Sequence, residues 1–470
     1  ARLVNVYSGE IIDGCQVAVS GGHIAWVGRN RRLPGPGTRI IDAGGAYLAP
    51  GFIDVHGHAD FLTNPVALIK SILPLGTTAM LSDTHDIVGA LGRLGLEIML
   101  SSTESLPFHC FLTVPAHCPP LPEVEGHDLL PLNEFRDFLD HPRVLAVSEL
   151  TAWTRLLAED PALSAKVDAA REAGLRLEGH TAGCSHDKLA ALAGMGISSC
   201  HESVSAEDVL RRLRLGIYTV LRHGSIRADL EILATAITAN PGLDTARVML
   251  TPDWMSPQDV VEFGYMEHVV TKAVEFGIPP VKAYQMATIN PATYLRLEHR
   301  LGGIGPGKEA DLILLEDLER PRPRIVMVGG QVVCEDGLLR ESFPPFPTVT
   351  VDEWPPTRVP PLPVGSGDFA IRMPDRVPGL ADGELTSVHM VNKTVTRPLR
   401  VTVPVVEGFF GELRGRCTSG ILAGESLELL YLSLWSHKRG RWLTVPLTGW
   451  GAPVGGLATT VVHETHAPLV

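Results

Sequence analysis

Between about residues 47 and 300, short runs of apolar and β-branched residues alternate with segments whose apolar positions have helical spacing. This alternation is typical of β/α units that build a parallel sheet. The runs are Tyr47–His58, Thr77–His85, Phe108–Ala116, Val144–Leu150, Leu175–His180, Ile197–Glu202, Tyr218–His223 and Val248–Asp253. Eight such units in about 250 residues predict an α/β fold, a (β/α)8 TIM-like barrel over residues 50–300.

The segments on either side of the barrel have the pattern of small β structures. Residues 1–49 contain short strand-like runs bounded by turn residues, and similar runs recur over residues 301–342. We expect these segments to form one discontinuous β-sandwich domain. Residues 343–363 are rich in proline and indicate an extended linker. Residues 364–470 are predicted to form a C-terminal domain, mostly β or α+β, that is incomplete.

Charge and cysteine usage exclude several classes of protein. The 470 residues carry 40 Lys and Arg against 53 Asp and Glu, a formal net charge of −13. Such an acidic chain lacks the basic surface that nucleic-acid binding requires. The seven cysteines form no CxxC pair, which argues against a disulfide framework and favours the cytoplasm. Without about 18 consecutive apolar residues no membrane span is predicted, and we expect a homo-oligomer, a dimer or tetramer.

Histidines and carboxylates stand at the carboxyl ends of the predicted strands. Residues two apart on a strand share a face, so His56 and His58 can bind one cation. The other candidate ligands close the fourth, fifth, sixth and eighth runs, and they are Glu149, His180, His201 and Asp253. Active sites of such barrels lie on this rim. Four imidazoles and two carboxylates suit two divalent transition-metal ions (Mn, Fe(II) or Zn), which activate water for hydrolysis.

Several segments resemble the motifs of one enzyme family. Pro50–His58 resembles the opening motif of the amidohydrolase superfamily, and later segments are similar to the adenine deaminase family. These later segments are Ser82–Ile87, Val114–Ala116, Ser148–Leu150, Glu178–His180, Cys200–Ser203, Arg222–Ser225, Ala287–Ala292 and Gly305–Asp311, with a weaker similarity at Gly456–His466. The resemblance implies a barrel of the metal-dependent hydrolase type. It also implies the conversion of adenine and water to hypoxanthine and ammonia.

The resemblance assigns roles to the same ligands that the strand ends indicate. It implies that His56, His58, Glu149, His180, His201 and Asp253 bind two divalent metal ions. Glu149 is then the ligand that bridges the ions. Asp253 is the catalytic residue that transfers a proton from the attacking water to the leaving amine, a role that contributes about 10²–10⁴-fold to a rate.

The sequence departs from the family pattern beside the expected metal site. The family's H-x-H-x-E-S reads His56-Gly57-His58-Ala59-Asp60-Phe61, and Trp254 replaces an acid that follows Asp253. An indole there alters the substrate pocket, so the expected substrate is adenine or a related aminated heterocycle. One alternative is an amidohydrolase that cleaves a cyclic or exocyclic amide of another flat ring. A second alternative is an inactive barrel that acts as a binding scaffold.

Other residues at the strand ends complete the candidate site. Glu202 and His85 are candidate catalytic residues, although strand alternation directs Glu202 away from the face that His201 occupies. The predicted substrate-binding residues are Trp254, Phe61, Asp83, Arg222 and Ser225. Several further histidines, His117 among them, have no partner in the sequence pattern and are interpreted as ordinary loop residues.

Overall fold

The chain divides into two units, of which the first contains the barrel. The first unit comprises residues 1–117, 130–181 and 186–349, and the second comprises residues 118–129, 182–185 and 350–470. The computed structural model describes residues 1–29, 35–119, 122, 126, 128–340, 342–347, 371–372, 383–391, 396–406, 409–410, 414–436 and 441–450. Most of the predicted linker at 343–363 and the segment Gly456–His466 lie outside the described residues.

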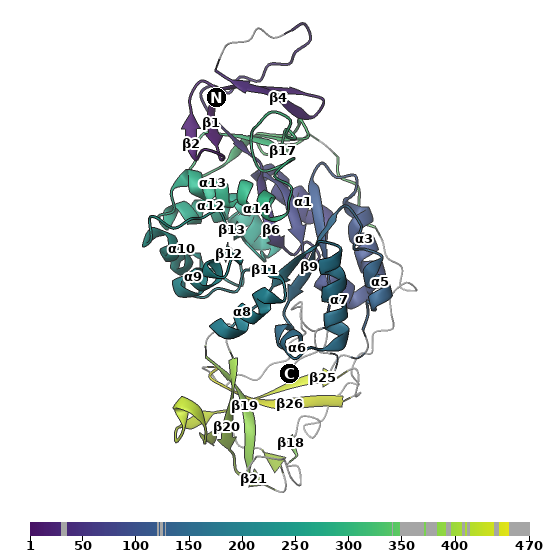
Figure 1. Ribbon diagram of the computed structural model, residues 1–470, viewed down its shortest axis with the longest axis vertical. Coiled ribbons are helices and arrows are strands. Elements are labelled where there is room, and N and C mark those ends of the chain that lie inside the picture. The colour runs from purple at the N-terminus through teal and green to yellow at the C-terminus, as the bar shows by residue number, and fades with distance from the viewer. Residues whose placement is uncertain are drawn as a thin grey trace. The chain divides into compact units, whose positions relative to one another are not determined.

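Eight parallel strands, arranged in their order along the chain, form the barrel (Figure 1). They are β6 (Phe52–Gly57), β7 (Thr77–Ser82), β8 (His109–Val114), β9 (Val144–Leu150), β10 (Arg176–Gly179), β11 (Ile197–Cys200), β12 (Tyr218–Arg222) and β13 (Val248–Thr251). The first and last strands meet where Gly57 forms a parallel bridge with Asp253. The Thr251 hydroxyl also donates to Asp54 Oδ1 at 2.7 Å across this junction. The ring is therefore closed, and the predicted (β/α)8 fold is confirmed.

Helices follow the barrel strands and pack around them (Figure 1). They are α1 (Pro65–Ile72), the 3₁₀ turn η1 (Leu73–Leu75), α2 (His85–Leu91), α3 (Arg93–Thr103), α5 (Leu132–Arg136), α6 (Trp153–Leu157), α7 (Pro161–Glu172), α8 (His186–Gly194), α9 (Ala206–Arg214), α10 (Leu230–Thr238), α11 (Pro257–Glu262), α12 (Met266–Glu275), α13 (Pro280–Met286) and α14 (Ile289–Tyr294). Local sequence explains several of the helix starts. The Asp160 side chain accepts hydrogen bonds from two backbone N–H groups of α7, and Pro161 occupies its first turn. Ser205 caps α9 by accepting from the Asp208 N–H.

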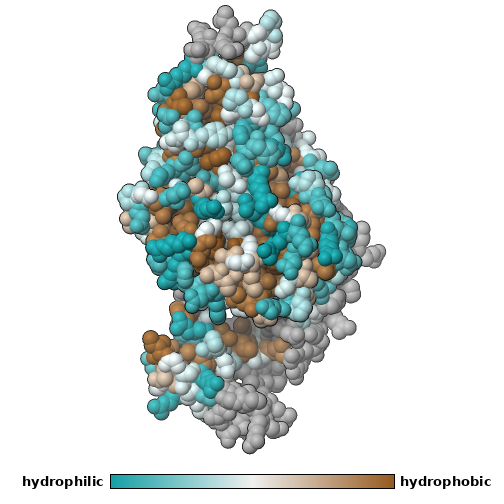
Figure 2. All heavy atoms as spheres, in the orientation of Figure 1, coloured by the Kyte–Doolittle hydropathy of each residue, from teal (hydrophilic) through white to brown (hydrophobic). Residues whose placement is uncertain are grey.

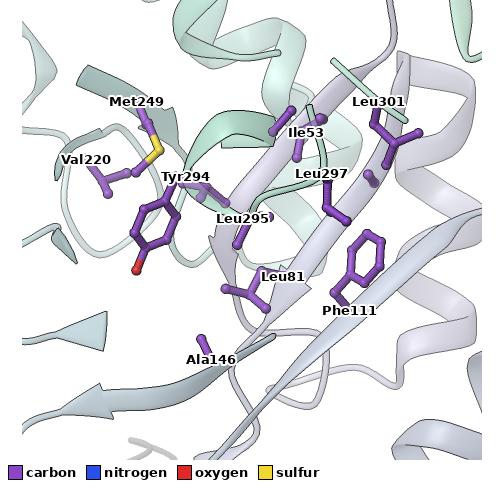
Figure 3. Packing of buried hydrophobic residues seen from close by; sticks show 13 residues of the cluster. Ile53, Leu81, Phe111, Ala146, Val220, Met249, Tyr294, Leu295, Leu297 and Leu301 are labelled. Carbon is purple, nitrogen blue, oxygen red and sulfur yellow. The ribbon is translucent and has the colours of Figure 1, made fainter. Parts of the chain in front are cut away.

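Apolar side chains from six of the barrel strands form one buried cluster, whose main members Figure 3 labels. The strand residues are Ile53, Val55, Ala79, Leu81, Phe111, Ala146, Val220 and Met249. Tyr294 and Leu295, at the end of α14, join this cluster. Because the strands surround the cluster, it fills the interior of the ring. Val220 precedes Arg222 by two residues on β12, so the apolar core lies beneath the polar residues of the carboxyl rim.

A seven-stranded sheet is built from the two segments that flank the barrel. Its order is β17-β16-β15-β14-β5-β1-β2. The bounds are β1 (Arg2–Asn5), β2 (Glu10–Ile12), β5 (Tyr47–Pro50), β14 (Leu312–Leu315), β15 (Pro323–Val328), β16 (Gln331–Glu335) and β17 (Leu338–Leu339). β5 pairs antiparallel with β14, and the hairpin of β3 (Gln16–Ser20) and β4 (His23–Gly28) shares a buried cluster with the sheet. Both flanks therefore contribute to one layered β structure, whose boundaries at 1–49 and 301–342 remain a prediction.

The described part of the second unit consists mainly of strands, as predicted for the C-terminal domain. A six-stranded sheet has the order β24-β23-β20-β19-β26-β25, and a three-stranded sheet has the order β18-β22-β21. The bounds are β18 (Ile371–Arg372), β19 (Glu384–Met390), β20 (Thr396–Thr402), β21 (Val405–Val406), β22 (Phe409–Phe410), β23 (Arg414–Cys417), the 3₁₀ turn η4 (Gly420–Leu422), β24 (Ser426–Glu428), β25 (Leu430–Ser436) and β26 (Arg441–Thr448). Leu385, Val401 and Cys417 lie in the small core of the larger sheet.

The surface of the barrel unit is of mixed character. Hydrophilic and hydrophobic residues are interspersed over the face seen in Figure 2. Among the exposed apolar side chains, Val261 and Phe263 lie in and just after α11. Single exposed apolar residues are ordinary on folded proteins. No helix within the described residues combines the length and the apolar character that a membrane span requires.

Candidate metal centre

His56, His58 and Asp253 form the first cluster of possible metal ligands. The two histidines lie at and just after the end of β6, and Asp253 follows β13, the strand that closes the ring against β6. Asp253 Oδ1 is 3.5 Å from His56 Nε2 and 3.3 Å from His58 Nε2. Ligand atoms that lie about 2.1 Å from one ion at tetrahedral angles are about 3.4 Å apart. The three atoms therefore have the spacing of ligands that share one metal ion.

Glu149 links this cluster to the other two histidines. It lies near the end of β9, whereas His180 and His201 follow directly after β10 and β11. Glu149 Oε2 is 2.5 Å from His180 Nδ1 and 3.0 Å from His201 Nε2, and Oε1 is 3.9 Å from His58 Nε2. His56, Glu149 and His201 also present ligand atoms within 4.8 Å of one another. One carboxylate thus faces both clusters, as a ligand between two ions would.

The main chain at Asp253 has an uncommon conformation that directs its side chain. Its φ is 62°, in the left-handed region that residues with a side chain rarely occupy, although Asp tolerates it better than most. The Asp253 N–H donates to Thr251 Oγ1 at 2.8 Å, which holds the loop in place. Backbone strain of this kind is found where a functional side chain needs a fixed position.

A carboxylate from β10 fixes the orientation of His56. Glu178 Oε2 accepts a hydrogen bond from His56 Nδ1 at 2.8 Å, so the proton lies on Nδ1 and Nε2 is left to face Asp253. Glu178 Oε1 accepts from the hydroxyls of Tyr294 at 2.8 Å and Ser199 at 3.0 Å. Glu178 was not among the predicted site residues. Its place two residues before His180 did not reveal this contact, because β10 ends at Gly179 and Glu178 meets His56, 122 positions away in the chain.

Arg222, on β12, joins Glu202 and Asp253. Its Nη1 is 2.5 Å from Glu202 Oε1 and 2.8 Å from Asp253 Oδ2, and all three side chains are largely buried. Glu202 Oε1 also lies 3.7 Å from the Nε2 atoms of His180 and His201. The expectation that Glu202 points away from His201 is therefore wrong. β11 ends at Cys200, so the strict alternation of a strand no longer applies at these two positions.

The electrostatic surroundings favour the ionised forms of Glu202 and Asp253 and the neutral form of His201. Burial acts to raise the pKa of Glu202, but the opposing effects of His180, Arg222 and His201 are larger in sum and lower it from 4.5 to about 2. Burial likewise opposes ionisation of Asp253, whose pKa is nevertheless held well below its usual range by the neighbouring imidazoles and Arg222. Burial and His56 lower the pKa of His201. Ionised carboxylates and neutral imidazoles are the forms that bind metal ions.

Asp83 and His85 lie beside Glu149 on the rim. Asp83 Oδ2 accepts a hydrogen bond from the Glu149 N–H at 2.9 Å, and Asp83 Oδ1 accepts from His85 Nδ1 at 3.0 Å. The predicted strand through His85 ends at Ser82, and His85 begins α2 instead. Both side chains are buried. The structure thus brings these two candidates to the ligand cluster, and their catalytic or substrate-binding roles remain predictions.

The remaining predicted substrate-binding residues lie in two places. The rings of Phe61 and Trp254 pack against each other with centroids 4.8 Å apart, where the loops after β6 and β13 meet. Ser225 is exposed, and its hydroxyl donates to Asp259 while it accepts from the Ser256 N–H at 2.8 Å. The described contacts of Ser225 therefore hold α11 and do not connect it to the ligand cluster.

The residues present fit divalent metal ions. Imidazole nitrogens and carboxylate oxygens are the donors that first-row transition metals prefer. Glu149, Glu178, Glu202 and Asp253 bring four carboxylates to a largely buried rim, and Arg222 compensates only part of their charge. Buried charge is costly unless it is paired or binds a cation. A ring of parallel strands with such a rim defines a metal-dependent hydrolase of the barrel type.

Comparisons with known proteins agree with this class and make it more specific. A profile of the amidohydrolase family matches residues 47–333, which span β5, the barrel, β14 and β15. The adenine deaminase of Moorella thermoacetica is 33% identical over all of this chain and 77% of its own length. That of Cenarchaeum symbiosum is 35% identical over 97% of this chain and 72% of its own. The chain therefore belongs to the adenine deaminase family of the amidohydrolases.

Solved structures share the fold at lower sequence identity. The β-aspartyl dipeptidase of Fervidobacterium islandicum AW-1 superimposes with a TM-score of 0.56, covering 73% of this chain and 96% of its own at 17% identity. A molinate hydrolase gives a TM-score of 0.53 over 74% of this chain and 97% of its own, also at 17% identity. Likeness at this level of identity shows a common barrel architecture and no more.

Proposed function

We propose that the chain is a metal-dependent deaminase that converts adenine, or a closely related aminated purine, to the oxo compound and ammonia. The observation that carries the proposal is the convergence of metal-ligand atoms on one rim. The six residues are His56, His58, Glu149, His180, His201 and Asp253. The adenine deaminases that match nearly the whole chain support adenine as the substrate.

We further propose that these residues hold two divalent transition-metal ions, Mn, Fe(II) or Zn. The spacing at Asp253 suits one ion, and Glu149 faces both histidine clusters. Two such ions supply Lewis acidity and lower the pKa of water between them to about 7. Glu178 and Asp83 are placed to hold the ligands His56 and Glu149 in position.

Asp253 carries out the proton transfer of the proposed reaction. It accepts a proton from the water that attacks C6 of the purine, and it delivers that proton to the exocyclic amine as the C–N bond breaks. The amine leaves as ammonia, and the water oxygen remains on the ring. His56 and His58, with Arg222 at 2.8 Å from Oδ2, hold the pKa of Asp253 well below its usual range and so keep it ionised before the attack. Proton transfer by a positioned side chain contributes about 10²–10⁴-fold.

Arg222 and Glu202 also offer polar atoms to the substrate. Arg222 Nε and Nη2 and Glu202 Oε2 are buried and have no hydrogen-bond partner within the described residues. Buried polar atoms of this kind are normally paired, so a ligand is the expected partner. Glu202 stays ionised and can only accept, whereas Arg222 can only donate. The pair therefore suits a ring that presents a donor N–H and an acceptor nitrogen close together.

Phe61 and Trp254 support a flat substrate and leave its identity open to test. Two packed aromatic rings on the rim favour a planar heterocycle over a flexible chain. The alternative function is cleavage of a cyclic or exocyclic amide of another flat ring. Trp254 favours this reading, since it stands where the family has an acid.

Ammonia release from adenine and a panel of aminopurines tests the proposal directly. Protein purified with Mn(II), Fe(II) or Zn(II) is assayed together with Asp253→Asn, which is expected to lose about 10²–10⁴-fold in kcat. Asp137→Asn, an exposed substitution on the helical shell, serves as the matched control and retains full activity. Amide hydrolysis without ammonia release would establish the alternative. A wild-type protein that binds no metal would leave only the scaffold reading.

We retain a cytoplasmic location and a dimer or tetramer as further proposals. None of the seven cysteines, all of which the structure describes, forms a disulfide, which supports a reducing compartment. Fractionation of cells and sizing of the purified protein in solution test these two proposals.

A further inference from the structure

His117 lies in a buried hydrogen-bonded chain on the rim of the barrel. It follows β8 by three residues and is only 3% exposed. Its Nδ1 is 2.9 Å from His85 Nε2, and its Nε2 is 3.0 Å from both the Thr151 hydroxyl and the Ala152 N–H. Strand ends of β7, β8 and β9 are thus connected through one imidazole. This residue carries no role in the sequence motifs.

The Ala152 N–H, the donor at one end of this hydrogen-bonded series, determines which ring nitrogen of His117 and of His85 carries the proton. A backbone N–H can only donate, so Nε2 of His117 accepts from Ala152 and the ring proton of His117 is on Nδ1. That proton is donated to His85 Nε2, which therefore carries none. The proton of His85 is then on Nδ1 and is donated to Asp83 Oδ1 at 3.0 Å. The hydrogen bonds thus assign one tautomer to each of the two histidines.

This series of hydrogen bonds ends at the backbone N–H of Glu149. Asp83 uses its second oxygen, Oδ2, to accept from the Glu149 N–H at 2.9 Å. Its first oxygen is held by His85 through both the ring and the backbone N–H, the latter at 2.9 Å. Asp83 is fully buried, and a rotation of its carboxylate would break contacts on both sides. The tautomer of His85 therefore determines how firmly the Glu149 backbone is held.

We propose that His117 is a positioning residue for Glu149, the carboxylate that faces both histidine clusters. By donating to His85 Nε2, it prevents His85 from adopting the opposite tautomer, in which Nδ1 has no proton for Asp83. This inference rests on the proposed metal-dependent function, because it assigns Glu149 to the metal centre. His117 itself contacts neither the predicted metal ligands nor the substrate residues within the described contacts.

Metal retention under a chelator tests the proposal without measuring turnover. Wild type, His117→Leu and His117→Asn are loaded with Zn(II), exposed to excess chelator, and analysed for bound metal over time. Leu fills the space without a donor, whereas the Asn amide can still donate to His85. We expect His117→Leu to release metal about 10–100-fold faster than wild type, the usual effect of losing such support. His117→Asn is expected to restore most of the retention.

A partly buried histidine elsewhere in the barrel unit supplies the control. His109 Nε2 contacts Asp311 Oδ2 at 2.8 Å, near the start of β8. His109→Leu also removes a polar contact to a buried carboxylate, yet it is expected to retain metal as wild type does. Equal losses in the two Leu variants would overturn the proposal, because general destabilisation would then explain both.

Coupling to Asp83 and direct observation of the protons complete the test. Asp83→Asn is expected to speed metal release, and adding His117→Leu to it should change the rate little further. Additive effects would show that His117 and Asp83 do not act through one hydrogen-bonded chain.

If the Leu variant fails to fold, nitrogen-15 NMR of histidine-labelled, zinc-bound wild type tests the proposal instead. A proton on Nδ1 of both His85 and His117 supports the proposal, and a proton on Nε2 of His85 overturns it. Wild type that never binds metal refutes the proposed function instead.

Discussion

Replacing Arg222 by methionine tests whether the rim depends on its charge. Arg222 Nη1 is 2.5 Å from Glu202 Oε1 and 2.8 Å from Asp253 Oδ2. Methionine keeps a long unbranched side chain in the same space and removes the positive charge. The two carboxylates, which are 3% and 13% exposed, then lose the cation that offsets them. The substitution therefore isolates the electrostatic part of the contact.

The expected loss is large in the metal-free protein. Removing one partner of a buried ion pair typically costs about 3–5 kcal/mol of unfolding free energy, because the other partner remains as an uncompensated buried charge. The control is Arg155→Met, whose pair with Asp160 is about a quarter exposed on each side. Pairs of this kind contribute about 0–1 kcal/mol. A clear difference between the two variants is therefore predicted.

The effect of Arg222→Met also depends on pH. The pKa of Glu202 is lowered from 4.5 to about 2 in the folded protein, partly by Arg222. A lowered carboxyl pKa contributes stability that is present above 4.5 and is lost as the pH falls towards 2. Removing Arg222 raises this pKa. The difference in stability between wild type and variant is thus full at neutral pH and shrinks as the pH falls through 4.5.

Urea unfolding of the metal-free proteins, followed by far-UV circular dichroism, provides the measurement. The α-helices whose bounds are given above lie in the unit that contains the barrel, so the helical signal reports mainly on that unit. An Arg222→Met protein within about 1 kcal/mol of wild type at neutral pH would refute the reasoning. So would a deficit equal to that of Arg155→Met, or one that grows as the pH is lowered.

Three further predictions address other parts of the molecule. Glu178→Ala removes the hydrogen-bond acceptor of His56 Nδ1, so the affinity of the protein for metal should fall about 10–100-fold. Bound metal is measured after dialysis, and an unchanged metal content would contradict this role of Glu178. Burial raises the pKa of Glu267 from 4.5 to about 8, so wild type should lose up to about 1.4 kcal/mol per pH unit between these values as the unfolded chain alone releases the proton. Glu267→Gln should flatten this slope in urea titrations, and an unchanged slope would show that other groups cause it. Trp254→Asp restores the family's acid and is expected to raise kcat/KM for adenine relative to other aminopurines, with metal content unchanged; equal ratios in both proteins would show that this position does not select the substrate.

The barrel and its ligand positions are predictable from sequence for a physical reason. Parallel strands place their carboxyl ends on one rim, so a residue at the end of one run lies near those at the ends of the others. His56, His180 and His201 follow this rule, and the structure brings them together. The rule states which rim a residue occupies. It does not state which atoms face each other there.

The supporting contacts were not predictable because they join residues far apart in the chain. Glu178 contacts His56 across 122 positions, and Tyr294 reaches Glu178 across 116. The orientation of Glu202 was predicted wrongly, since alternation ends where the strand does. His117 lacks any local signal beyond its place after β8. Such contacts follow from the closure of the ring, which no local pattern encodes.

The loop after β13 carries Asp253, a candidate metal ligand, directly before Trp254, a candidate substrate-binding residue. Its main chain is fixed where the Ser225 N–H donates to the Trp254 carbonyl at 2.9 Å. At Gly224 a Cβ atom would collide with the carbonyl oxygens of Pro252 and Trp254, so the two loops approach as closely as only glycine allows. These contacts use the backbone at 254 and not the indole. A different side chain at position 254 can therefore change the surface beside the candidate ligands while Asp253 keeps its place.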